Sequence, residues 1–294
     1  MRVTAIGFVD LHVHSTASDG TRTPSEVVRA AAAIGLTGMA LTDHDTVDGL
    51  EEAAAEARAQ GLALLTGAEL SANEPGSSIH LLAYGFDAED PDLLEFMEIY
   101  RADRIRRARE IVHRFNGLGV SLGYDAVERE TGRAAPTRAH VARALVADAL
   151  IPTQQEVFGR YLSRGMPAFV EKRPTPPALV IEIVHNAGGV VLLAHPGRTH
   201  GVADVRRWVA DGLDGVEVMH PSNGPTVRQR MGDLVREEHL LRSGGSDWHG
   251  PATHRAELGS EEVPAGWLAE IADRCRAPFV GPRADDEPAS HRQL

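Results

Sequence analysis

The fold is decided by how the chain opens, with the run VTAIGFVDLHVH at residues 3–14 and the run TGMALTDHD at residues 37–45. The first run is apolar and β-branched and alternates at its end, which is typical of a strand. The text between the two runs predicts a helix, because Thr23 suits the N-cap, Pro24 the first helical position and Glu26 the third. Together these segments form one βαβ unit.

The same alternation continues as far as residue 86. We expect a second helix over residues 50–60, closed by Gly61, and two further strands over residues 62–70 and 78–86. Strands that alternate with helices of about ten residues indicate βαβ units, and hence an α/β protein with a parallel sheet.

The pattern changes after Asp87. One long helical stretch rich in arginine covers residues 91–119, and helical, strand-poor text continues to residue 171. The alternation then resumes, with helices expected over 177–189 and near 224–238 and strands over 190–196, 215–221 and 240–249. We therefore predict a β/α domain interrupted by a helical insertion. The predicted regions are residues 1–86 and 173–283 for the β/α domain, 87–172 for the insertion and 284–294 for a flexible tail.

Composition and charge exclude several classes of protein. The 294 residues carry 30 Lys+Arg against 42 Asp+Glu, and this formal charge of −12 argues against coating long nucleic acid or an anionic membrane. Cys275 is the single cysteine, so a disulfide framework and a cysteine-based zinc finger are excluded. The chain has no apolar run of 18 residues for a membrane span, and its start lacks the features of a signal peptide. We therefore expect a cytoplasmic protein.

The 14 histidines matter by their position more than by their number. His12 and His14 lie two residues apart at the end of the first strand, so their side chains face the same way, and Asp247 and His249 repeat this spacing on the last strand. In an α/β barrel the C-terminal ends of the strands share one face, where such enzymes keep their chemistry. The side chains expected to meet there are His12, His14, Asp19, His44, Glu69, His80, His195, Asp247 and His249.

Imidazoles and carboxylates without thiolates predict a site for divalent metal ions. This donor set suits Zn²⁺, Mn²⁺ or Fe²⁺ better than Ca²⁺. One centre uses three or four protein ligands, so nine candidates predict more than one ion, and a carboxylate such as Glu69 can bridge two ions. Asp10 shares the face of His12 and is a candidate to orient a metal-bound imidazole, with Ser15 and Thr42 as further outer donors.

Other polar residues receive more ordinary interpretations. His220 follows an expected strand and is left open, as a site residue or an ordinary one. The arginines of RADRIRRARE, residues 101–110, are expected on a solvated helix face, paired with carboxylates of their own helix. Lys172 and Arg173 are expected to be surface charges. The histidines interpreted as ordinary are His113, His185, His200, His239, His254 and His291.

Six short motifs resemble those of a known superfamily and occur in its order. They are DLHVHSTASDG, ALTDHD, GAELS, HLLAYG, LLAHPGR and SGGSDWHG, between residues 10 and 250. They resemble the PHP (polymerase and histidinol phosphatase) superfamily of metal-dependent phosphoesterases. The match is nearest to the branch of nucleoside 3′,5′-bisphosphate phosphatases and the 5′→3′ oligoribonuclease called ribonuclease AM. The resemblance implies a distorted (β/α)₇ barrel with an inserted helical subdomain.

The resemblance also implies roles for individual residues. Two to three divalent ions are expected, Mn²⁺ first and Zn²⁺ or Fe²⁺ as alternatives. Asp19, His44, Asp247 and His249 would act in catalysis. Arg138, His140 and Arg198 would bind the substrate. The three implied ion sites are His12, His14, Glu69 and Asp247; Glu69, His80 and His195; and Asp19, His44 and His249.

These residues predict hydrolysis of a phosphate monoester by metal-bound hydroxide. The expected substrate is a small nucleotide, first the 3′-phosphate of a nucleoside 3′,5′-bisphosphate. The alternatives left open are a 5′→3′ exoribonuclease acting on short 5′-phosphorylated oligonucleotides and a histidinol-phosphate phosphatase. An amidohydrolase acting on a C–N bond and a non-catalytic PHP-like metal-binding module are the alternatives of other classes. A sequence-specific nucleic-acid binder finds no support in an acidic chain without a basic stripe. The sequence predicts no oligomeric state.

Overall fold

The computed structural model describes residues 7–132, 134–197, 199–251 and 256–276. The expected tail at 284–294, residue Arg198 and residues 3–6 of the first expected strand lie outside these ranges. Among the described residues, no helix is long and apolar enough to cross a membrane.

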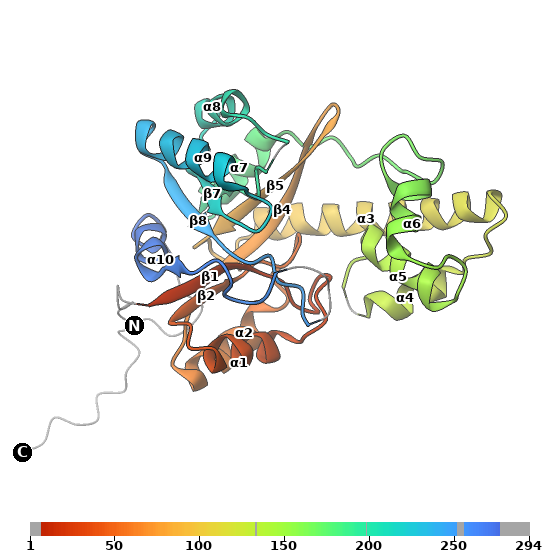
Figure 1. Ribbon diagram of the computed structural model, residues 1–294, viewed down its shortest axis with the longest axis horizontal. Helices are drawn as coiled ribbons and strands as arrows, with labels where there is room; N and C mark the ends of the chain where they lie inside the picture. The colour runs from red at the N-terminus through yellow and green to blue at the C-terminus, as the bar shows by residue number, and fades with distance from the viewer. Residues whose placement is uncertain (1–6, 133, 198, 252–255, 277–294) are drawn as a thin grey trace, which may run out of the picture.

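The strands form two sheets (Figure 1). One has four strands in the order β3-β2-β1-β9, and the other has five in the order β4-β5-β6-β7-β8. Two isolated parallel bridges connect them, between Val13 and Trp248 and between His44 and Glu69. No closed barrel forms over the ranges described. The strands are β1 (Phe8–Val13), β2 (Gly38–Leu41), β3 (Ala63–Leu65), β4 (Gly67–Glu74), β5 (Ser77–Tyr84), β6 (Val190–Leu193), β7 (Gly215–Met219), β8 (Leu241–Gly244) and β9 (Val263–Pro264).

The sheets are mixed, so the expectation of a parallel sheet is wrong for part of the protein. β1 pairs parallel with β2, and β6 with β7, but β4–β5 and β5–β6 are antiparallel. The cause is a tight turn between β4 and β5, where Gly76 has φ +89°, because so short a connection can join only antiparallel strands. The strand expected over 62–70 is also divided, with β3 in one sheet and β4 in the other. A mixed α/β fold remains.

Helices cover the sheets and confirm the expected helical starts and stops. Thr23 and Glu26 form the predicted capping box of the first helix, and Gly61 closes the second in a left-handed conformation with φ +68°. Because these signals are local, they could be read from neighbouring residues alone. The covering helices are α1 (Pro24–Ala33), α2 (Leu50–Gln60), α7 (Pro177–Asn186), α8 (Val202–Ala210), α9 (Pro225–Glu237) and α10 (Ala265–Ala272).

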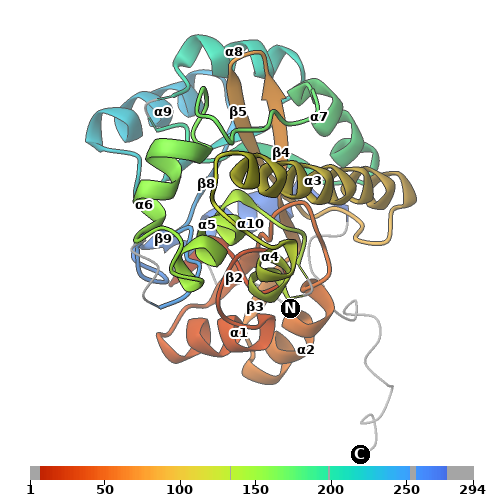
Figure 2. The ribbon, with the colours of Figure 1, turned by 90° about the vertical axis from the view of Figure 1, so that its right-hand side faces the viewer.

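A second group of helices stands beside the sheets, in yellow and green in Figure 1. It has its own apolar core, with Phe115, Val141 and Leu145 at its centre, and Figure 2 views it face on. The long α3 connects the two parts, because Leu93 and Phe96 in its first half pack into the core of the five-stranded sheet. The group comprises α3 (Pro91–Gly117), α4 (Tyr124–Thr131), α5 (Arg138–Ala147), α6 (Gln154–Val157) and the π-helical turn η1 (Phe158–Leu162).

Candidate metal centre and anion pocket

The nine candidate ligands come from six segments of the chain. His12 lies on β1 and His14 just after it, while Glu69 lies near the start of β4 and His80 on β5. The other candidates lie in loops: Asp19 after β1, His44 after β2, His195 after β6, and Asp247 and His249 after β8. Gly245 lets two of these segments approach closely, since a Cβ there would lie 2.4 Å from the backbone nitrogen of His12.

Glu69 is the centre of the cluster, and its side chain is 1% exposed. Its Oε2 lies 3.2 Å from His12 Nε2, 3.1 Å from His14 Nε2 and 3.2 Å from His44 Nδ1. One carboxylate oxygen therefore faces three imidazole nitrogens, from β1, from the residue just after it and from the loop after β2.

The other oxygen of Glu69 faces two more imidazoles. Its Oε1 lies 2.7 Å from His80 Nδ1 and 2.9 Å from His195 Nε2. The carboxylate therefore bridges two sets of histidines, which is the arrangement expected of a ligand shared by two ions.

Asp19 and Asp247 complete the cluster on its outer side. Asp19 Oδ1 lies 3.1 Å from His249 Nε2 and 3.9 Å from His44 Nε2. Asp247 Oδ1 lies 3.3 Å from His14 Nε2 and 3.6 Å from His12 Nε2. All nine side chains predicted from strand ends thus lie in one continuous cluster.

The donor atoms of this cluster fit divalent cations. His12 Nε2 and His14 Nε2 lie 3.1 Å apart and face the same carboxylates, so both cannot carry a proton without repulsion. Within the described ranges, Nδ1 of His14 is buried without a hydrogen-bond partner. Groups such as His12, His14, Glu69 and Asp247 offer one atom each within 4.8 Å of one another. Buried nitrogen and oxygen lone pairs that converge in this way suit Mn²⁺, Zn²⁺ or Fe²⁺.

The charges inside the cluster also favour a cation. Burial by itself raises the pKa of Glu69, but the imidazoles around it, with His12 both charged and hydrogen-bonded to it, hold that pKa well below its usual range. At His44 burial lowers the pKa more than the carboxylates of Glu69 and Asp19 raise it. The pKa of His44 therefore falls to about 3, and this ring stays neutral. At His14 burial is outweighed instead by Asp247 and Glu69, which raise its pKa to about 9. Positive charge thus has to accompany the buried carboxylates at neutral pH.

The expected outer donors do something other than orient imidazoles. Asp10 accepts from Ser246 Oγ at 2.6 Å and from the backbone N–H groups of Ser246 and Gly259, at 3.0 and 2.8 Å, so it binds loops and no ring. Ser15 Oγ donates to Asp43 at 2.7 Å, and Thr42 Oγ1 bonds to the backbone of Val13. Among the described residues Asp10 therefore orients no imidazole, contrary to its prediction, and all three side chains stabilise the backbone that carries the ligands.

Two further residues lie next to the cluster: Glu217, which the sequence patterns did not predict, and His220, which they left open. Glu217 on β7 is fully buried, with Oε1 2.9 Å from His12 Nδ1. His220 lies 3.6 Å from Asp247 through Nε2, and its ring centroid is 5.3 Å from that of His195. A signal existed for Glu217, because it is the single charged residue in the otherwise apolar strand GVEVM.

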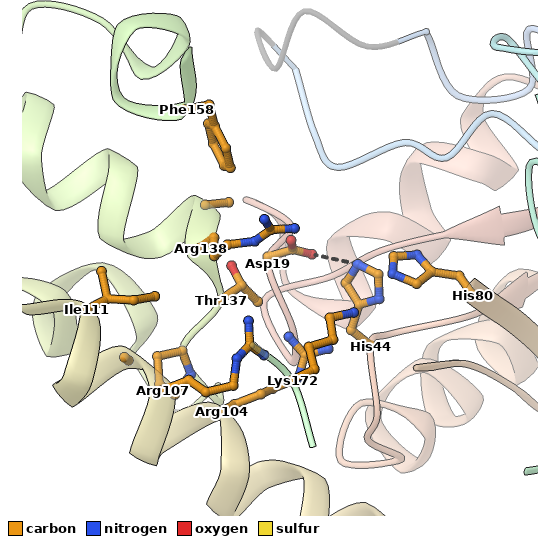
Figure 3. Close-up of a pocket in the computed structure, with 13 residues that line it drawn as sticks. Asp19, His44, His80, Arg104, Arg107, Ile111, Thr137, Arg138, Phe158 and Lys172 are labelled. Carbon is orange, nitrogen blue, oxygen red and sulfur yellow. Dashed lines mark ion pairs between the residues drawn. The ribbon is translucent and has the colours of Figure 1, made fainter. Parts of the chain in front are cut away.

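A pocket lies between the cluster and the helical group (Figure 3). Asp19, His44 and His80 line one side. The other side carries four basic side chains from α3, α5 and the segment before α7, and the aromatic ring of Phe158 lies on η1. The four basic residues are Arg104, Arg107, Arg138 and Lys172.

Of these four cations, only Arg104 is paired with a carboxylate within the described ranges. Its Nε donates to Asp45 Oδ2 at 3.0 Å, which connects α3 to the loop that carries His44. Arg107 is 7% exposed and its Nε has no hydrogen-bond partner. The expectation of a solvated arginine face is therefore wrong at Arg104 and Arg107, although Arg106 does pair with Asp103 of its own helix.

Burial and mutual repulsion disfavour the charges in this pocket. Burial is the main cause, and the neighbouring charge of Arg104 the second, that lowers the pKa of Arg107 to about 10. Burial likewise lowers the pKa of Lys172 to about 7. Lys172 donates to Ser78 Oγ at 2.9 Å and lines the pocket, so its interpretation as a surface charge is wrong. Arg138 donates to the carbonyl of Leu162 at 3.2 Å. Among the described residues, Arg107, Arg138 and Lys172 thus bring three positive charges to the pocket without a carboxylate partner, which fits an anionic ligand.

Of the other two predicted substrate residues, only His140 lies in the described ranges, and it does not line this pocket. His140 is 1% exposed, and its Nδ1 accepts from the backbone N–H of Thr137 at 3.0 Å in the capping box of α5. It therefore stabilises the helix that presents Arg138. Arg198 lies outside the described residues.

Known proteins similar to this chain are phosphoesterases. The model of the PHP domain matches residues 10–124. A 5′-3′ exoribonuclease from Haemophilus influenzae is 37% identical over 82% of this chain and 90% of its own length. A 3′,5′-nucleoside bisphosphate phosphatase from Chromobacterium violaceum is 32% identical over 87% and 92%, respectively. A solved structure described as a metal-dependent phosphoesterase from Bifidobacterium adolescentis superposes with a TM-score of 0.85 at 34% identity, over 91% of this chain and 96% of the other.

Proposed function

Because the chain belongs to the PHP family of metal-dependent phosphoesterases, we propose that it removes the 3′-phosphate from nucleoside 3′,5′-bisphosphates. The observation that carries this proposal is a cluster of nine candidate ligands that opens onto a pocket with three cations unpaired by carboxylates. A substrate with two phosphates on one ribose presents one anion to each of these two features.

The nine side chains would hold two to three divalent ions, with Mn²⁺ the first candidate. His12, His14, Glu69 and Asp247 form one proposed site. Glu69, His80 and His195 form the second, and Asp19, His44 and His249 the third. The chemistry that divalent ions supply in such a site is activation of water and neutralisation of charge on phosphoryl oxygens.

The residues assigned to catalysis face the reacting phosphate. Asp19 and His44 line the pocket directly, and His249 Nε2 lies 3.1 Å from Asp19. Asp247 Oδ1 lies 3.3 Å from His14 Nε2 and so joins the cluster behind the residues that line the pocket. These residues would keep the reacting group between the cluster and the basic side chains of Arg107, Arg138 and Lys172, called the cationic wall below.

The cationic wall would bind the phosphate that does not react. Arg107 and Arg138 can each donate two hydrogen bonds to phosphate oxygens, and Lys172 adds a compact charge. Phe158 offers an apolar face beside them for the nucleoside. Arg198, in the loop after His195, stays a proposed substrate residue.

A second candidate function is supported by the Haemophilus influenzae relative, named a 5′-3′ exoribonuclease. On a short 5′-phosphorylated oligonucleotide, the terminal phosphate would occupy the cationic wall and the next phosphodiester would reach the cluster. Rates of phosphate and nucleotide release from 3′-phosphoadenosine 5′-phosphate and from 5′-phosphorylated dinucleotides distinguish the two reactions. The net charge of −12 disfavours long nucleic acid in either case.

We also propose a domain arrangement for this function. The bridges Val13–Trp248 and His44–Glu69 support a distorted (β/α)₇ barrel made of residues 1–86 and 173–283. Residues 87–172 would form the inserted helical cap, since its later helices share a core of their own and its arginines face the cluster.

The test of the proposed function is phosphate release from 3′-phosphoadenosine 5′-phosphate with Mn²⁺ by wild type and by His12→Ala. We expect the variant to lose at least 100-fold in kcat/KM, since His12 faces Glu69, His14 and Asp247 together. His113→Ala is the control, because His113 is an exposed histidine on α3. Near-normal turnover of His12→Ala, or no turnover by wild type, refutes the proposal.

A further inference from the structure

Glu217 contacts two of the candidate metal ligands from outside the cluster. It lies on β7, is 0% exposed and is the single charged residue of that strand. Its Oε1 lies 2.9 Å from His12 Nδ1, and its Oε2 accepts from the backbone N–H of His195 at 2.6 Å. One buried carboxylate therefore connects a ligand on β1 with a ligand after β6.

The two nitrogens of His12 have different surroundings. Nδ1 faces only Glu217 among the polar contacts of the described residues, whereas Nε2 faces His14 at 3.1 Å and Glu69 at 3.2 Å. A carboxylate at 2.9 Å is an acceptor, so it favours the tautomer with the proton on Nδ1. That tautomer directs the Nε2 lone pair into the cluster.

The bond to His195 acts on its backbone. His195 has φ +26°, in a region that residues other than glycine seldom adopt. The hydrogen bond from its N–H to Glu217 holds this conformation, and the ring then reaches Glu69 Oε1 at 2.9 Å through Nε2. Without an acceptor at this position, the loop would lose the contact that holds the His195 backbone.

We propose that Glu217 is a positioning residue: it sets the tautomer of His12 and the backbone of His195, and so prepares two ligands in advance of metal binding. The inference rests on the proposed function, because it assumes that the cluster holds divalent ions. A partner of this kind on the second ring nitrogen of a ligand histidine typically changes metal affinity by about 10–100-fold.

A different role for Glu217 would be to bind an ion of its own. His12, Glu217 and His220 lie close enough to offer one ligand atom each. Both oxygens of Glu217, however, already lie at hydrogen-bond distance from His12 Nδ1 and from the His195 N–H. His220 Nδ1 likewise lies 2.9 Å from Ser222 Oγ. We therefore assign Glu217 to positioning, and an extra ion that depends on it would overturn this assignment.

The sharpest variant is Glu217→Gln, which keeps the shape but replaces one acceptor oxygen with an NH₂ group. Either the His195 N–H or the His12 Nδ1–H then faces a donor, and relief at His12 requires the proton to move to Nε2, into the cluster. Asp214→Asn is the matched control. Asp214 also accepts from an imidazole, His185 Nε2 at 2.7 Å, and from a backbone N–H, Val191 at 2.8 Å, but at the opposite end of β6.

Three measurements on the full chain test the proposal. Titration calorimetry with Mn²⁺ should show Glu217→Gln binding about 10–100-fold more weakly than wild type, with unchanged stoichiometry, and Asp214→Asn binding normally. Phosphatase activity of Glu217→Gln should recover when Mn²⁺ is raised by the same factor. In ¹⁵N-histidine NMR of metal-free wild type, where no ion dictates the tautomer, His12 should carry a proton on Nδ1.

The possible outcomes separate the two roles. Wild-type affinity in Glu217→Gln, loss of one whole ion, or a wild-type His12 without a proton on Nδ1 overturns the positioning role while the proposed function stands. Wild type that binds no divalent ion refutes the proposed function, and this inference with it. If Glu217→Gln fails to fold, the NMR measurement on wild type is sufficient, because it reports the His12 tautomer directly.

Discussion

Replacing Arg107 with glutamine should weaken recognition of a second phosphate and leave the fold intact. Arg107 lies in the wall of the anion pocket, 7% exposed, with its Nε unpartnered. The substitution removes the charge and most of the donors but keeps much of the aliphatic stem. Binding and stability should therefore change in opposite directions.

The expected loss of binding follows from the type of contact. A hydrogen bond that involves a charged group contributes about 1.5–3 kcal/mol, which corresponds to about 10- to 150-fold in affinity. The loss should affect only substrates with a second phosphate. The kcat/KM for 3′-phosphoadenosine 5′-phosphate should fall by that factor, and kcat/KM for adenosine 3′-monophosphate should hardly change.

The expected gain in stability follows from the cost of the unpaired charge. Burial, then Arg104, lowers the pKa of Arg107 from 12.5 to about 10, which corresponds to roughly 3 kcal/mol against the charged form. Lost packing of the guanidinium offsets part of this gain. We therefore expect Arg107→Gln to match or exceed the Tm of wild type by a few degrees, as at other sites where function is retained at the expense of stability.

The assay compares both substrates in wild type, Arg107→Gln and Arg106→Gln, together with thermal unfolding of each protein. Arg106 is the neighbouring arginine on the same helix, 57% exposed and paired with Asp103, so its substitution should change neither quantity. Equal losses on both substrates, or a Tm well below that of wild type, would refute the reasoning, because they would indicate a structural role for Arg107.

Three other features lead to predictions of their own. Arg104→Met leaves the buried carboxylate of Asp45 without its guanidinium and should cost about 3 kcal/mol in urea unfolding, with loss of phosphatase activity; an unchanged midpoint would contradict this. Burial lowers the pKa of Lys172 to about 7, so its positive charge is lost as pH rises through 7; KM for the bisphosphate should rise above pH 7 in wild type and not in Lys172→Met. Burial also lowers the pKa of His140 from 6.5 to about 4, so the fold holds the neutral ring. The free energy of unfolding should therefore fall as pH drops below 6.5, by at most about 2 kcal/mol at pH 5. In metal-free protein this part of the pH dependence should disappear in His140→Gln, which keeps an acceptor for the Thr137 N–H.

The features that the sequence predicted well depend on neighbouring residues. The capping box of Thr23 and Glu26 and the stop at Gly61 are set within one helical turn. The convergence of the nine side chains could be anticipated because polar residues that follow or end apolar runs tend to meet at one edge of a sheet, while their role as metal ligands stays a prediction. Local spacing and the shared edge of the strands were sufficient for both.

Other features depend on partners that are far apart in the sequence. The direction of β5 is set by its turn and by pairing with β6, across more than 100 residues. Arg104 is indistinguishable from Arg106 in the sequence, and only the approach of α3 to the loop at Asp45 separates them. Lys172 has an ordinary surface context, yet the chain returns it to the pocket wall. Such placements follow from tertiary packing, which no local pattern contains.

The central claim is that the histidine and carboxylate cluster uses divalent ions to hydrolyse a nucleotide phosphate. The most direct test is phosphate release from 3′-phosphoadenosine 5′-phosphate by chelator-stripped protein during titration with Mn²⁺, with the nucleotide product identified. We predict no release before Mn²⁺ is added, then turnover that saturates at two to three ions per chain, with adenosine 5′-monophosphate as the product. Undiminished turnover by the stripped protein, or no turnover at any Mn²⁺ concentration, would contradict the claim.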